Sequence, residues 1–301
     1  MSSKSTNPLL KKLGFSLTDR VVIIHTDDIG MCHATIDAYA QLDDAGTISS
    51  GSVMVPCPWF LSAVTYAKTH PKTDLGIHLT LNSEWETYRW RPLSTTDPST
   101  GLIDTQGFFH RKHEEPQEFA DPIAVAVELK TQIEHALTIG FKPTHVDTHM
   151  LTLLHPKFLR VYLQAAYHFG LPAMIAGYDQ DNWLQKGFTS EEVIILATIV
   201  REFEEQGYPM LDSFGGLKLA IASQRMEQAK QALTALPAGI HHFYIHPSLD
   251  TPEARAISPD WQGRVADYET FLNPELGEFL KNEGILVIGY RAIQEMMPAQ
   301  S

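Results

Sequence analysis

An apolar run that ends in two adjacent carboxylates constrains this chain most. Residues 21–24 are four β-branched residues, and they lead through His25 and Thr26 into Asp27 and Asp28. Such a run is typical of a strand that is buried on both faces, as in a parallel sheet. Two ionisable groups at the end of an interior strand are costly to bury unless they are paired, hydrogen-bonded or bound to a metal. The pair therefore predicts an active site, although Asp28 could instead cap a following helix.

Strand and helix patterns alternate along the rest of the chain. After the opening strand, further strands are expected at 47–55, 74–82, 143–150, 171–176, 210–214, 239–247 and 285–289. Helices are expected at 32–44, 59–70, 123–139, 156–169, 190–206, 224–236 and within 264–282. Strands that alternate with helices favour a parallel sheet. About eight strands in one α/β domain spanning residues 1–301 favour a single (β/α) barrel over an open doubly wound sheet.

A long segment without strand or helix periodicity follows the third expected strand. Residues 83–122 are rich in Trp, Tyr, Arg, Pro, Ser and Thr. Irregular insertions of this length in α/β domains are usually lids or binding loops. We therefore expect an insertion lobe that faces the substrate and carries Trp85, Tyr88 and Trp90.

Ionisable side chains stand at the carboxyl ends of four expected strands. They are Asp27, Asp28, His78, His145, Asp147, His149 and His246. Because ligands bind where the carboxyl ends of parallel strands emerge, these side chains are expected at one rim, with those at 145, 147 and 149 projecting from the same face. Imidazole and carboxylate bind Zn²⁺ and related cations, and three protein ligands leave a position for water. Each histidine has a structural alternative, and we interpret His25 and His242 as structural.

The same strand ends resemble the signature blocks of a known family. The segments HTDDIG, GIHLTLN, PTHVDTH and YIHP begin at residues 25, 76, 143 and 244. In this order and spacing they resemble the YdjC-like (ChbG-type) carbohydrate deacetylase family over roughly residues 20–292. The resemblance implies a distorted TIM-like barrel, one divalent metal ion (Mg or Zn) and removal of an N-acetyl group from an amino sugar or oligosaccharide.

The resemblance also implies roles for individual residues. By position, the metal ligands would be Asp28, His78 and His149, the general base Asp27 and the acid His246. We assign His145 and Asp147 to the support of the ligands, because neighbouring groups orient ligand side chains in metal sites. The aromatic rings at 85, 88 and 90 offer flat faces for a sugar ring, although an aromatic cluster in a loop can also form a local core.

Charge, apolar runs and cysteine content limit the expected binding partners and cellular compartment of the protein. A formal net charge of −13 repels phosphate backbones, so nucleic acid is not an expected partner. The N-terminus lacks the apolar core of a signal peptide, and no run of about 18 apolar residues predicts a membrane span. Cys32 and Cys57 form no CxxC pair, which favours a cytoplasmic protein with reduced thiols. The expected partner is an N-acetylated sugar, and a homo-oligomer is compatible with the sequence.

Two other functions remain open on the sequence alone. One is a non-catalytic sugar-binding or regulatory protein on the same fold, although such a protein has no need of both Asp27 and His246. The other is a metal hydrolase of another bond, such as a phosphoester. The acidic net charge argues mildly against polyanionic substrates.

Overall fold

The strands of the chain form one curled parallel sheet. A computed structural model describes residues 7–298, so the expected domain bounds at residues 1 and 301 lie outside the described part. Within it the strands are β1 (Arg20–Ile29), β2 (Ser50–Val53), β3 (Leu75–Leu79), β4 (Val146–Thr148), β5 (Ser213–Gly216), β6 (Gly239–Ile245) and β7 (Ile285–Val287). Their order is β4-β3-β2-β1-β6-β5, with β7 also paired to β1, and every pairing is parallel.

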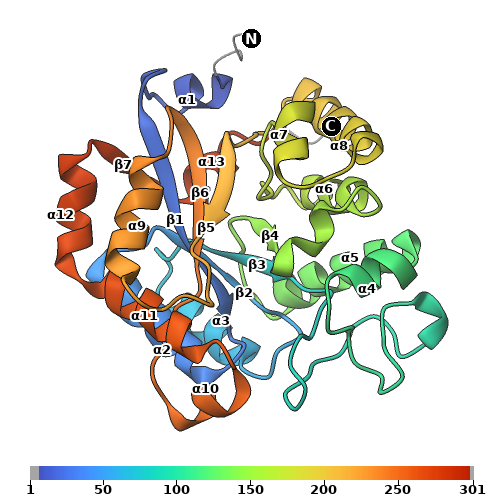
Figure 1. Cartoon of the computed structure of the whole chain (residues 1–301). Coiled ribbons are helices and arrows are strands. Elements are labelled where there is room, and N and C mark those ends of the chain that lie inside the picture. Colours follow the sequence, from blue (N-terminus) through green and yellow to red (C-terminus); the bar gives the residue numbers. More distant parts are fainter. Residues whose placement is uncertain (1–6, 299–301) are drawn as a thin grey trace.

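Helices cover this sheet in two groups. In chain order they are α1 (Pro8–Lys12), α2 (His33–Ala45), α3 (Phe60–Thr69), α4 (Glu114–Phe119), α5 (Pro122–Thr138), α6 (Leu159–His168), α7 (Gln180–Gln185), α8 (Ser190–Glu205), α9 (Arg225–Thr234), α10 (Pro252–Ile257), α11 (Trp261–Leu272), α12 (Pro274–Asn282) and α13 (Tyr290–Gln294), with the 3-10 helices η1 (Pro98–Thr100) and η2 (His149–Leu154). Figure 1 shows α9, α11 and α12 on one side of the strands, and α5, α6 and α8 on the other. None of the helices within residues 7–298 has the length and apolar character needed to cross a bilayer.

The predicted opening strand lies at the centre of the sheet. β1 pairs with β6 along one edge, while β7 pairs with its first residues and β2 with its last on the other. The four β-branched side chains at 21–24 are fully buried, as the run predicted. α2 also ends as expected, at Gly46, which adopts the left-handed conformation (φ 67°) common after a helix.

Two predicted elements differ in the structure. Residues 171–176 form isolated bridges at Ala173 and Ala176 in place of a strand, so the described residues hold seven strands and not eight. Pro172 has no N–H to donate, which limits a ladder there. The sheet is therefore a half-barrel, a distorted form of the predicted one. The helix expected within 264–282 is two helices, because the Asn273 side chain caps α12 and Pro274 begins it.

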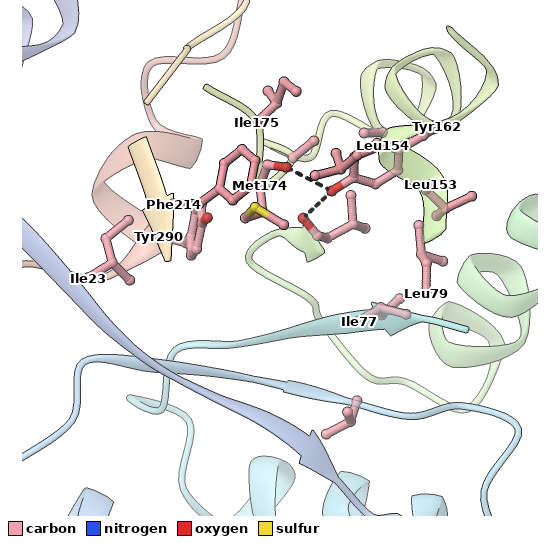
Figure 2. Close-up of a cluster of buried hydrophobic side chains, with 14 of the residues drawn as sticks. Ile23, Ile77, Leu79, Leu153, Leu154, Tyr162, Met174, Ile175, Phe214 and Tyr290 are labelled. Atoms are coloured by element: carbon pink, nitrogen blue, oxygen red, sulfur yellow. Dashed lines mark hydrogen bonds between the residues drawn. The ribbon is translucent and has the colours of Figure 1, made fainter. Parts of the chain in front are cut away.

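Apolar packing fills the side of the barrel where the strand is missing. Figure 2 shows Ile77 and Leu79 of β3 facing Leu153 and Leu154 of η2, with Tyr162 of α6 beside them. The Tyr162 hydroxyl lies within hydrogen-bond distance of two backbone carbonyls, at 3.1 Å from residue 146 and 3.4 Å from residue 174. Buried side chains thus join β4 to the irregular segment after α6, and the polar site can form at the carboxyl end of the sheet.

Candidate metal centre and active site

A bulge at the end of β1 turns both carboxylates toward one site. In a regular strand, neighbouring side chains point to opposite faces. Here the pairing with β2 shifts register between Thr26 and Ile29, and Asp28 has a left-handed backbone (φ 62°). Bulges beside active sites commonly re-aim a side chain, and this conformation costs about 1–3 kcal/mol at a residue other than glycine. Both carboxylates are buried: Asp27 contacts His246, which follows β6, and Asp28 contacts His78 of β3.

Three potential ligand atoms converge at this point. Asp28, His78 and His149 each offer one, and the three atoms lie within 4.8 Å of one another. Asp28 Oδ1 is 3.3 Å from His78 Nε2 and 3.1 Å from His149 Nδ1, and the two nitrogens are 3.2 Å apart. Yet this buried oxygen has no partner of good hydrogen-bond geometry among the described residues. Three potential ligand atoms around one point, one of them an oxygen without a hydrogen-bond partner, fit a divalent cation.

A carboxylate holds the other nitrogen of each candidate ligand histidine. His78 Nδ1 is 2.8 Å from Asp147 Oδ1, and His149 Nε2 is 3.0 Å from Glu84 Oε2. Such contacts fix the tautomer and the orientation of a ligand imidazole. Asp147 thus contacts His78, one of the candidate ligands. Glu84 was not assigned a role, because it lies in a segment without periodicity, close to the GIHLTLN block.

Arg264 balances the charge of Asp28. Its Nη1 donates to Asp28 Oδ2 at 2.7 Å, and its Nε donates to Asp260 at 2.8 Å. Burial alone would raise the pKa of Asp28, but Arg264 and the two candidate ligand histidines hold that pKa well below its usual range. Asp28 therefore stays ionised, as a metal ligand must. The sequence suggested no role for Arg264, because it is a single basic residue in a helix.

Protons compete with a cation at the two histidines. Burial lowers the pKa of His149, but Glu84 and Asp28 outweigh it and raise this pKa to about 9. Likewise, Asp147 and Asp27 outweigh burial and raise the pKa of His78 well above its ordinary value. A histidine must be neutral to bind a metal, so binding must displace these protons.

Metal affinity is therefore expected to rise with pH. Between pH 6 and about 9, the apparent affinity for Zn²⁺ should increase about tenfold per pH unit from the displacement of the His149 proton alone. Calorimetric titrations in buffers of different ionisation enthalpy would measure both the affinity and the protons released. The control Glu84→Gln removes the carboxylate that raises this pKa, so it should flatten the dependence. An affinity independent of pH in the unmodified protein would contradict the expectation.

The candidate base and acid face each other beside the three ligand atoms. Asp27 Oδ1 is 2.7 Å from His25 Nδ1, whereas its Oδ2 is 3.6 Å from His246 Nε2. His246 follows β6, and its backbone N–H donates to Asp267, whose other oxygen accepts from Arg225. The second ring nitrogen of His246 is buried and has no partner among residues 7–298.

The side chains of His145 and Asp147 both approach the His25 ring, His145 at 2.8 Å and Asp147 at 3.8 Å, so they lie on the same side of the sheet. β4 contains only residues 146–148, and His149 already belongs to η2. His145 lies two residues before Asp147, about 7 Å lower along the strand. There it contacts His25 at 2.8 Å and stacks on Tyr290, with ring centroids 3.9 Å apart. Its closest polar contact is thus with His25, and the predicted support of the ligands by His145 stays a prediction.

The three aromatic residues at 85, 88 and 90 pack together beside the candidate metal centre. Their ring centroids lie 5.7–6.2 Å apart, and Trp90 lies 6.2 Å from the ring of His149. Trp85 and Trp90 are buried, whereas Tyr88 is half-buried and donates its hydroxyl to the backbone of Met31. The Trp85 and Trp90 rings correspond to the local-core alternative and not to an open platform, because they pack on one another.

A second group of ionisable side chains lies deeper in the barrel. His25, Asp27, Asp147 and His242 also bring ligand atoms within 4.8 Å of one another. These atoms, however, already have partners: His242 Nδ1 meets the Tyr290 hydroxyl at 2.8 Å, and the oxygens of Asp147 meet a histidine and a serine. The lone pairs are thus used within the protein, in contrast to the orphaned oxygen of Asp28.

Known proteins resemble the chain over almost its whole length. A family described as YdjC-like protein matches residues 21–282. A Thermus thermophilus protein named carbohydrate deacetylase is 33% identical over 289 residues, which cover 96% of this chain and 99% of the relative. A Thermoanaerobacter pseudethanolicus protein of the same name is 22% identical over 275 residues, which cover 91% of this chain and 100% of the relative. A solved structure described as a putative cellobiose-phosphate cleavage protein from Enterococcus faecalis has the same fold, with a TM-score of 0.74 and 20% sequence identity. The match covers 91% of this chain and 99% of the solved one.

Proposed function

Because the chain belongs to the YdjC-like protein family, we propose that it is a carbohydrate deacetylase that uses a divalent metal ion to remove an N-acetyl group from an amino sugar. One observation carries the proposal: three potential ligand atoms converge, and a carboxylate and an imidazole outside this set of three face each other nearby. The name shared by full-length relatives supports the substrate class.

The residue types suit amide hydrolysis. A cation held by Asp28, His78 and His149 would polarise the acetyl carbonyl and lower the pKa of the attacking water. Asp27 would accept a proton from that water at Oδ2, since its Oδ1 is already engaged by His25. His246 would deliver a proton to the departing amine nitrogen, because an amine leaves readily only when it is protonated.

The segment at residues 83–122 would form a substrate-facing lobe. It contributes Glu84 and Trp90 to the surroundings of His149, so it is continuous with the metal centre. A cavity of about 480 Å³ lies beside η2, and Met150 and Leu151, which directly follow that histidine, line it. This volume is in the range of small-ligand sites. It would accommodate a part of the substrate beyond the reacting acetyl group.

The proposal predicts metal-dependent release of acetate. The purified protein, loaded with Zn²⁺, Mg²⁺ or Mn²⁺, should release acetate from at least one member of a panel of N-acetylated mono- and oligosaccharides. Chelation should abolish the release and the metal should restore it. Enzymatic quantification of acetate, together with metal analysis, would measure both.

The same panel separates the two other functions. A non-catalytic sugar-binding protein would bind a sugar in calorimetry without releasing acetate, and a phosphoesterase would hydrolyse phosphorylated sugars instead. A fully metallated protein that released no acetate from any substrate would refute the proposal. The presence of both Asp27 and His246 beside the cluster favours hydrolysis over simple binding.

A further inference from the structure

A buried chain of polar groups leads away from Asp27 into the barrel. Asp27 Oδ1 is 2.7 Å from His25 Nδ1, and His25 Nε2 is 2.8 Å from His145 Nε2. His145 Nδ1 is 3.0 Å from Thr144 Oγ1, which is 2.5 Å from Asp74 Oδ1. The three intermediate side chains are almost completely buried. The chain therefore joins the candidate base to the opposite end of the sheet, where Asp74 precedes β3.

We propose that His25 is a positioning residue for Asp27. It holds Oδ1 of the carboxylate with a fixed Nδ1–H, so that Oδ2 alone faces the reacting water and His246. The inference rests on the proposed deacetylase function, because it assigns the orientation of that reaction's base. His25 itself touches neither the substrate nor the candidate cation.

The pattern of donors and acceptors determines which nitrogen of His25 carries its proton. A carboxylate only accepts, so His25 Nδ1 carries the proton that it donates to Asp27. One proton also lies between the two Nε2 atoms, which are 2.8 Å apart. At the far end the Thr144 hydroxyl, 3.0 Å from the other nitrogen of His145, donates to Asp74 Oδ1.

The far end of the chain is an acceptor. Burial and the nearby imidazoles lower the pKa of His145 well below its ordinary value, so this ring is neutral and has one N–H. Asp74 accepts from the Thr144 hydroxyl and from the backbone N–H of Arg291, so the chain ends on its carboxylate.

Packing holds the two imidazoles in place. The ring centroids of His25 and His242 are 4.5 Å apart, and the His145 ring stacks on Tyr290. Residue 76 must be glycine for this arrangement, because a Cβ there would lie 2.5 Å from the His145 ring. The rings therefore cannot rotate freely, and the orientation of His25 is passed on to Asp27.

Two substitutions at position 25 separate positioning from packing. In His25→Asn, the amide nitrogen can replace Nδ1 and still donate to Asp27. In His25→Gln, the amide nitrogen lies near the former Nε2 position and can reach only His145. We expect His25→Gln to lower kcat for acetate release about 10- to 100-fold at unchanged KM and metal content, whereas His25→Asn keeps kcat within about threefold of the unmodified protein. Equal losses in both variants, or no loss in His25→Gln, would overturn the proposal.

His241 provides a matched control on β6. It is also a buried histidine with a partner at each ring nitrogen, Ser213 at 2.7 Å and the backbone carbonyl of Pro237 at 2.8 Å, but it has no link to Asp27. His241→Asn and His241→Gln should change the melting temperature and leave kcat unaltered. A purely structural effect at position 25 would resemble these controls.

A tautomer measurement tests the inference independently of activity. Nitrogen-15 NMR of the histidine-labelled protein, with the His25 signals identified by their loss in His25→Asn, should show a His25 ring that carries a proton on Nδ1. Protonation on Nε2 alone would overturn the positioning role, whatever the activity. If the unmodified protein showed the Nδ1 tautomer but released no acetate from any sugar, the proposed function would fail while the orientation of Asp27 stood.

Discussion

Replacing Asp27 with asparagine is expected to lower kcat for acetate release about 10²- to 10⁴-fold, the usual contribution of a general base. Asparagine has nearly the same shape, and its amide oxygen can still accept from His25 Nδ1. It cannot, however, take a proton from water at the position of Oδ2. The three candidate ligands are unchanged, so metal content should stay at the level of the unmodified protein. Steady-state kinetics combined with elemental analysis would measure both quantities.

Asp43→Asn is a suitable control for this variant. Asp43 lies near the end of α2, where it accepts from the Tyr66 hydroxyl at 3.1 Å. This contact does not involve any of the candidate ligands. It should retain full activity. If Asp27→Asn also kept kcat within about threefold of the unmodified protein, Asp27 would not be the base.

Replacing His78 with alanine is expected to remove the metal and with it the activity. The change deletes one of three ligand atoms and leaves the buried Asp147 carboxylate without the imidazole that, against the cost of burial, lowers its pKa. Metal affinity should fall by more than the 10- to 100-fold that is typical of losing a group that only orients a ligand. Elemental analysis after dialysis and the melting temperature with added Zn²⁺ would measure the loss.

The melting temperature also shows whether a variant is folded. Saturating metal at 100 times its dissociation constant stabilises a native protein by about 2.7 kcal/mol, so the unmodified protein should melt higher when Zn²⁺ is added. His78→Ala should show no such shift, while His241→Ala, another buried histidine, should still show it. If His78→Ala does not fold, His149→Ala tests the same site. Full metal content in both ligand variants would contradict the assignment.

The sequence predicted the elements whose signals are local. The apolar run of β1 and the glycine after α2 need only neighbouring residues to be interpreted, and both predictions are confirmed. The segment at 171–176 was wrongly predicted as a strand, because its apolar residues are buried by packing on Tyr162 and not by a ladder. The single helix predicted within 264–282 is two helices, because Asn273 caps the second one and Pro274 begins it. The apolar pattern continues across this break and therefore predicted one helix.

The sequence by itself determined which strand ends carry ionisable residues, since a parallel sheet brings its carboxyl ends to one rim whatever its curvature. It could not determine which atoms meet there. Only the tertiary structure decided that Arg264 reaches Asp28 across 236 positions of the chain, and that His145 contacts His25. These contacts depend on the bulge in β1, the shortness of β4 and the curl of the sheet. Each of those arises from packing between distant segments, which a local pattern of residues does not encode.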